Sequence, residues 1–165
     1  TDKYGWTPLH WAARNGHVEV SQMLVRMGAN VHARDHWVGR TPLHWAAVNG
    51  HVEVSRMLVG AGANVHTPNE LGDTPLHVSA ANGHVEVSQM LVGVGANVHA
   101  TDDHERCPLH SAACNGHVEM SQMLLGAGTN IHATDKYGRT PLHSAATQGH
   151  VEVTQMLVEA GGNVH

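Results

Sequence analysis

Apolar residues along this chain follow the spacing of short helices. The first such stripe has an i, i+3, i+4, i+7 pattern and consists of Val20, Met23, Leu24 and Met27. This pattern predicts an amphipathic helix that buries one face and ends near Gly28. A shorter helix is expected before it, because Thr7-Pro8 is a typical helix start and Asn15-Gly16 is a typical helix end. The chain therefore opens with two consecutive helices joined by a tight turn.

The same pair of helices is expected five times, because the surrounding phrase recurs along the chain. It begins at Thr7, Thr41, Thr74, Cys107 and Thr140, at intervals of 34, 33, 33 and 33 residues. A period of this size is typical of a solenoid, whose stacked units share a core that none could form alone. Val38 is interpreted as the inserted residue behind the longer interval. One domain, 1–165, is predicted, with approximate copies at 1–33, 34–66, 67–99, 100–132 and 133–165.

The recurring phrase resembles the ankyrin repeat, and the resemblance covers all 165 residues. Close variants of the motifs T-P-L-H-x-A-A and N-G-H-x-E carry it in every copy. The resemblance implies an all-α repeat solenoid in which each unit is a helix-turn-helix plus a projecting β-hairpin or loop. It also implies a non-enzymatic module that binds another protein through a concave face, which the hairpin tips and first helices line.

Charge and composition restrict the function further. Nine basic and fourteen acidic residues give a net charge of -5, which disfavours a nucleic-acid partner. No apolar run reaches the roughly 18 residues of a membrane span, and no signal-peptide pattern is present. Cys107 and Cys114 are expected to be free thiols, because their helical spacing of about 10 Å is too long for a disulfide. We therefore expect an intracellular protein, cytoplasmic or nuclear, without membrane contact.

Seventeen histidines raise the question of a metal site. Fifteen fall in three columns of the repeat, which begin at His10, His17 and His32. Neighbouring units lie about 8–10 Å apart, whereas a zinc–nitrogen bond spans about 2 Å, so a column cannot share one ion. We expect no metal and interpret the His10 column as hydrogen-bonding loops within and between units. The His32 column replaces the asparagine of the ankyrin pattern, which predicts acid sensitivity because imidazole titrates near neutral pH.

The sequence contains no convincing catalytic arrangement. Cys114 lies one helical turn from His110, but that histidine belongs to a structural column. Glu19 and its equivalents occur as single carboxylates, and the glycines occur singly at turns rather than in a phosphate-binding loop. No catalytic residue and no cofactor are therefore expected.

Large and charged residues vary at the predicted tips and on the first helices, which the resemblance places on the binding face. Trp, Tyr and Arg most often carry binding energy at protein interfaces. The hot spot is predicted at Trp6, Trp37, Arg14 and Arg40. For Trp11 and Trp45, packing under a hairpin is an equally good interpretation. The full predicted partner-binding set is Tyr4, Trp6, Trp11, Arg14, His36, Trp37, Arg40, Trp45, Leu71, Asp73, His104, Arg106, Tyr137 and Arg139.

Two interpretations of the array remain open. It is either a natural binding module, excised from a longer array, or an engineered or structural array with no evolved target. Near-identical frameworks support the second, whereas drift in the framework, as at Met120 and Thr129, is typical of divergence after duplication. The first and last copies keep the internal pattern instead of a polar outer face. This predicts end-to-end self-association.

The fourth copy is predicted to be the weakest interior unit. Glu105 stands where the other four tips have glycine, and Cys107 stands where the other copies have the helix-capping threonine. A non-glycine residue at positive φ costs about 1 kcal/mol or more. Loss of a hydroxyl cap typically costs about 1 kcal/mol.

Overall fold

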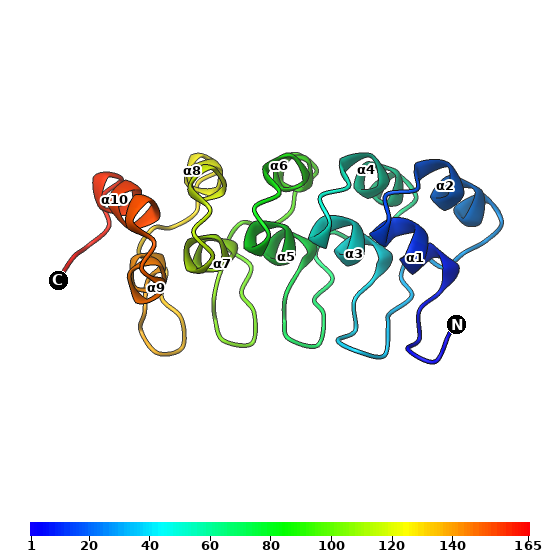
Figure 1. The fold of residues 1–165 in the computed structure, drawn as a ribbon, viewed down its shortest axis with the longest axis horizontal. Coiled ribbons are helices and arrows are strands. Elements are labelled where there is room, and N and C mark those ends of the chain that lie inside the picture. Colours follow the sequence, from blue (N-terminus) through cyan, green and yellow to red (C-terminus); the bar gives the residue numbers. More distant parts are fainter.

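The computed structural model describes residues 1–165 and contains ten α-helices in five consecutive pairs (Figure 1). The pairs are α1 (Pro8–Arg14) with α2 (Val18–Arg26), α3 (Pro42–Val48) with α4 (Val52–Gly60), α5 (Pro75–Ala81) with α6 (Val85–Gly93), α7 (Pro108–Cys114) with α8 (Val118–Gly126), and α9 (Pro141–Gln148) with α10 (Val151–Glu159). Each pair, with the loop before it, is here called a unit, numbered 1 to 5. First helices pack in one row and second helices in another, with the loops projecting on the side of the first helices (Figure 1). The predicted all-α solenoid is confirmed.

Every first helix begins with the same reciprocal cap. In unit 1 the Thr7 hydroxyl accepts a hydrogen bond from the His10 backbone N–H at 3.4 Å, and His10 Nδ1 accepts one from the Thr7 N–H at 3.0 Å. Pro8 occupies the first helical position, where its fixed φ suits the helix. In unit 4 the Cys107 sulfur replaces the hydroxyl, 3.2 Å from His110 Nδ1, and the box persists. The expected loss of this cap was therefore wrong.

One continuous core runs through all five units. Leu9 and Leu43 are fully buried at the first helices, and Leu58 and Leu91 are fully buried at the second helices. The column that begins at Ser21 is polar but satisfied, since Ser21 Oγ donates to the His17 carbonyl of the preceding turn at 2.7 Å. No helix in the chain has both the length and the apolar character needed to cross a membrane.

The projecting segments are closed loops, not hairpins with regular strands. The loop of unit 2 is closed by a backbone hydrogen bond from the Asp35 N–H to the Arg40 carbonyl, at 2.9 Å. A second bond joins neighbouring loops, from the His36 N–H to the Tyr4 carbonyl at 2.9 Å. In the other four loops the closing bond spans one residue fewer, so the inserted residue assigned to Val38 lengthens this loop as expected.

Two columns of histidine link each unit to its neighbours. His10 Nε2 donates to the Arg40 carbonyl of unit 2 at 3.1 Å, while Nδ1 of the same ring serves the cap of unit 1. His51 Nε2 contacts the Arg14 carbonyl of the preceding unit at 2.9 Å. Both contacts repeat at every joint. The structural interpretation of the His10 column is thus confirmed.

Acid sensitivity is expected from the buried column rather than from the His32 column, whose side chains are exposed. Burial lowers the pKa of His44 to about 4 and also lowers the pKa values of His10, His77 and His110. Below about pH 6.5 the unfolded chain therefore takes up protons first. We expect each such histidine to remove about 1.4 kcal/mol of unfolding free energy per pH unit, down to its folded pKa. Denaturant unfolding at stepped pH values measures this loss.

The exposed His66 of the third column provides the matched control. A His66→Asn variant should keep the same pH dependence as the parent chain. An unfolding free energy that stays constant between about pH 7 and about pH 5 would contradict the assignment to the buried column.

The fourth copy of the sequence repeat, approximately residues 100–132, contains two local defects. Glu105 has φ of 59° and is the only non-glycine residue with positive φ, as expected from its position. The Thr129 hydroxyl, on the loop after α8, is buried without a hydrogen-bond partner. Both features cost stability relative to the equivalent glycine and alanine.

We expect the double variant Glu105→Gly, Cys107→Thr to melt about 2–4 °C above the parent chain, because it relieves about 1 kcal/mol of backbone strain. Nearly all of the gain should come from Glu105→Gly, since the sulfur already completes the cap. Glu70→Gly is the control, because Glu70 lies in the unit 3 loop at ordinary φ, and it should not raise the melting temperature. A lower melting temperature for the double variant would show that the turn of unit 4 is a compensated feature.

Candidate functional site

A pocket of about 500 Å³ lies between the loops of units 1 and 2 and helix α1. Its lining comes from three elements: the first loop, the second loop and the exposed side of the helix. The lining residues are Lys3, Tyr4, Trp6, Trp11, Arg14, His36 and Trp37. Six of these seven belong to the partner-binding set predicted from the sequence. Lys3 was missed, although its sequence signal was a cation directly beside Tyr4 in a tip.

The indole rings of Trp6 and Trp11 line this pocket together with Trp37, and the buried ring of Trp45 packs against Trp6. Trp6 lies between Trp11 and Trp45, with ring centroids 4.5 Å and 4.4 Å away. Trp6 is only 5% exposed and Trp45 only 6%. Neither is therefore a free tip residue, and the expected exposed role of Trp6 is replaced by a packed one. We refer to Trp6, Trp11 and Trp45 as the tryptophan stack.

Hydrogen bonds to loop aspartates fix two of these indoles. Trp45 Nε1 donates to Asp35 Oδ2 at 2.9 Å, and Trp11 Nε1 donates to Asp2 Oδ2 at 3.2 Å. Burial acts to raise the pKa of Asp35, but three backbone N–H groups of its own loop and the Trp45 indole lower it below the ordinary value. The carboxylates nearest the pocket are thus ionised and committed to holding the loops.

Arginine replaces the indole as the aspartate's partner in the last two units. Arg106 pairs with Asp102 at 2.6 Å, and Arg139 pairs with Asp135 at 2.7 Å. The first helices of these units carry serine where unit 2 carries Trp45, so no indole competes for the carboxylate. The pairing with Arg139 helps to lower the pKa of Asp135 to about 2, against the opposing effect of burial.

Arg40 makes no such ion pair; its loop is one residue longer than those of units 4 and 5, and the Trp45 indole binds Asp35 Oδ2. The Arg40 guanidinium lies over the Trp45 ring, 4.9 Å from the centroid, and its Nε is buried without a partner. Burial lowers the pKa of Arg40, while the nearby carboxylates of Asp73 and Asp35 oppose that shift. Arg40 is thus a cation held against the back of the tryptophan stack.

Arg14 lies on the open side of the same stack. Its guanidinium carbon is 5.5, 5.6 and 5.8 Å from the ring centroids of Trp6, Trp11 and Trp45. Lys3 lies over Tyr4 at 4.8 Å. The pocket therefore combines an aromatic interior with cations at its rim.

The two loops that frame the pocket are locked together. The ring of His36 packs over Gly5, where an added Cβ would approach within 2.4 Å of it. Gly5 also has φ of 77°, which a side chain rarely tolerates. The packing of His36 on Gly5 and the hydrogen bond from the His36 N–H to the Tyr4 carbonyl keep Tyr4 and Trp37 beside the same pocket.

The other predicted residues extend along the loops of units 3 to 5. Leu71 and Tyr137 are 54% and 67% exposed, and His104 and Arg139 are also exposed. Three residues of the predicted set are half-buried: Arg40, Asp73 and Arg106. The whole set comes from loops and first helices, but only units 1 and 2 assemble it around the large aromatic pocket.

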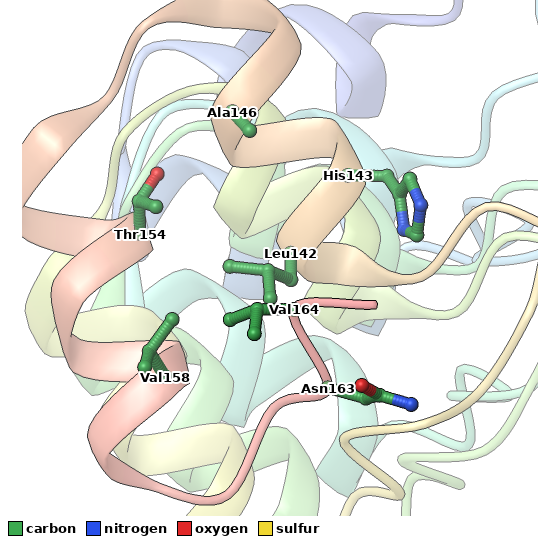
Figure 2. Close-up of a pocket in the computed structure, with 7 residues that line it drawn as sticks. All are labelled: Leu142, His143, Ala146, Thr154, Val158, Asn163 and Val164. Atoms are coloured by element: carbon green, nitrogen blue, oxygen red, sulfur yellow. The ribbon is translucent and has the colours of Figure 1, made fainter.

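A second, smaller hollow of about 240 Å³ lies on the outer side of unit 5 (Figure 2). It separates α9 from α10 and the last residues of the chain, and Leu142, Val158 and Val164 supply much of its apolar surface (Figure 2). In units 1 to 4 the next unit packs against the corresponding side. In the 165-residue chain this side of unit 5 is uncovered.

Comparison with protein families agrees with the repeat pattern. A family model described as ankyrin repeats (3 copies) matches residues 34–102, 58–135 and 94–165. A model described as ankyrin repeat matches residues 4–36. The matches together extend over nearly the entire chain.

Proposed function

The chain belongs to the ankyrin repeat family, and on that premise we propose that it is a module that binds another protein through its loop tips and first helices. Members of the family are generally protein–protein interaction modules and are typically not enzymes. The observation that carries the proposal is the aromatic pocket of units 1 and 2. We also propose an intracellular location, in keeping with the free thiols of Cys107 and Cys114.

The exposure of the tip aromatics supports this face. Trp37 is 71% exposed, Tyr4 55% and Tyr137 67%, so these side chains contribute little to the core. Large aromatic residues that stay exposed on a rigid scaffold are typical of binding surfaces. Trp6 and Trp45 act in this proposal as supports that hold Trp11 and Arg14 in place, not as direct contacts.

We expect Trp37→Ala to weaken partner binding by about 2 kcal/mol or more, as truncation of a true anchor does. Proteins captured on the immobilised chain would be purified, and their affinities for parent and variant chains measured by calorimetry. Gln89→Ala is the control, because Gln89 is exposed on α6, in the row of second helices. Affinities that change by less than about threefold in Trp37→Ala and Tyr4→Ala would remove this face from consideration.

The alternative proposal is an engineered or structural array with no evolved target. The near-identity of the five frameworks favours it. The same experiment separates the two proposals, because an array without a target would yield no protein whose binding depends on the tip residues.

We further propose that copies of this chain associate end to end. At the first unit, Val20 and Met23 are 43% and 55% exposed, whereas the equivalents of Val20 in units 2 to 5 are buried. At the last unit, the hollow beside Val158 is uncovered (Figure 2). Within the 165 residues, the histidine contacts that close the internal joints are unmatched at His17 in unit 1 and at His143 in unit 5. The C-terminal end of one molecule thus matches the N-terminal end of another.

Val158→Asp should reduce this association, because it places a charge in the face that a second copy would cover. Sedimentation velocity over a range of concentrations would follow the change from assembly to monomer. Val94→Asp is the matched control, an exposed valine in the interior of the array that should leave association unchanged. Monomeric behaviour of the parent chain at high concentration would refute the proposal.

A further inference from the structure

We propose that the pocket of units 1 and 2 selects an acidic segment of the partner protein. A bulky apolar or aromatic side chain of that segment enters the pocket, and a neighbouring carboxylate pairs with Arg14. This inference rests on the proposed binding function and adds the chemistry of the partner.

The state of Arg14 is the first argument. The guanidinium carbon of Arg14 lies on the open side of the tryptophan stack, 5.5 to 5.8 Å from the three ring centroids. Neither ion pair of the structure involves it, since these join Arg106 to Asp102 and Arg139 to Asp135. Its N–H donors are therefore free to bind a carboxylate, and its cation–π contacts favour a position beside the pocket. A preorganised guanidinium loses little freedom when it binds, which favours a charge-assisted pair.

The charge of the lining is the second argument. Lys3 and Arg14 are both at the pocket, and no acidic residue lines it. Asp35 is buried behind the lining and Asp2 is exposed beside it, and indole and backbone N–H groups bind the oxygens of both carboxylates. This local excess of positive charge stands out in a chain whose net charge is -5. An incoming acidic group thus meets complementary charge at this one place.

Unit 5 provides an internal comparison. Its tip has the same Lys-Tyr-Gly sequence as the tip of unit 1, and Lys136 lies over Tyr137 at 5.2 Å. Its arginine, Arg139, is neutralised by Asp135. Its first helix carries Ser144 in place of Trp11. The tip sequence alone therefore does not create the pocket, which requires the tryptophan stack and the unpaired Arg14.

The size of the pocket accommodates a bulky side chain of a folded or extended protein segment. A volume of about 500 Å³ lies within the range of specific ligand sites. Nucleic acid would bring many phosphates against a chain that is acidic overall, which opposes binding beyond the pocket itself. A short acidic peptide places only a few charges at the rim and its apolar side chain on the aromatic floor.

The test uses three fluorescein-labelled peptides with Gly-Ser flanks, and anisotropy as the readout. The first has the core Glu-Asp-Phe-Glu, the second the neutral core Gln-Asn-Phe-Gln, and the third the core Glu-Asp-Ala-Glu. We expect the first to bind at least about tenfold more tightly than either of the others, with an affinity that falls as salt is added. This comparison uses the parent chain and does not depend on how any variant folds.

Variants then locate the site. Trp37→Ala should weaken binding of the first peptide by about tenfold or more, and Arg14→Gln should remove most of its advantage over the neutral peptide. Tyr137→Ala and Lys136→Gln, in the matched tip of unit 5, should have no effect. Thermal melting of Arg14→Gln checks that the tryptophan stack survives.

Several results would overturn the inference. One is equal binding of the acidic and neutral peptides, and another is an equal loss of peptide affinity in Tyr137→Ala and Trp37→Ala. Preferred binding of a single-stranded oligonucleotide would also overturn it, as would self-association that Trp37→Ala abolishes. The proposed binding function has a separate outcome. If the binding of captured proteins depends on Trp37 but not on Arg14 or on salt, the proposed binding face is correct and the proposed preference for an acidic segment is wrong.

Discussion

The architecture depends on one interaction, the buried imidazole that joins each unit to the next. In His44, Nδ1 accepts from the backbone of its own unit at 3.2 Å, and Nε2 donates to the Asp73 carbonyl of the following unit at 3.1 Å. One neutral ring thus satisfies a helix start and fixes the base of the next loop. Because each unit is too small to form a core alone, this contact and the leucine columns make the five units a single structure.

That constraint frees the loop tips to differ. The loops of units 2 to 5 are each held at the base by a histidine of the preceding unit, and all five loops are closed at the neck by one backbone bond, so the side chains at the tips can vary. The packing of the His36 ring over Gly5 and the hydrogen bond from the His36 N–H to the Tyr4 carbonyl hold the tips of units 1 and 2 together in a defined pocket. A site placed on such a fixed frame loses little entropy on binding.

The loop aspartates of units 2, 4 and 5 differ in the partner that binds one carboxylate oxygen. Where the first helix carries tryptophan, as at Trp45, the indole N–H binds the aspartate and Arg40 makes no ion pair. Where it carries serine, as at Ser111, the arginine takes the carboxylate. The arginine is therefore paired with aspartate in units 4 and 5, where the first helix carries serine, and makes no ion pair in unit 2, where the helix carries tryptophan and the loop is one residue longer. This difference makes the aromatic end of the array electrostatically different from the serine end.

The sequence by itself determined the fold, because the apolar spacing, the Thr-Pro starts and the glycine ends are local signals repeated at a constant period. It also placed the strained turn, since four glycines at one position identify Glu105 as the exception. The burial of Trp6 could not be predicted from its place beside a tip, because it depends on Trp11 and Trp45, which reach it from two different units. The persistence of the Cys107 cap likewise depended on a sulfur being close enough to His110. Tertiary structure decided these points because they depend on which groups compete for the same space and the same hydrogen-bond partner.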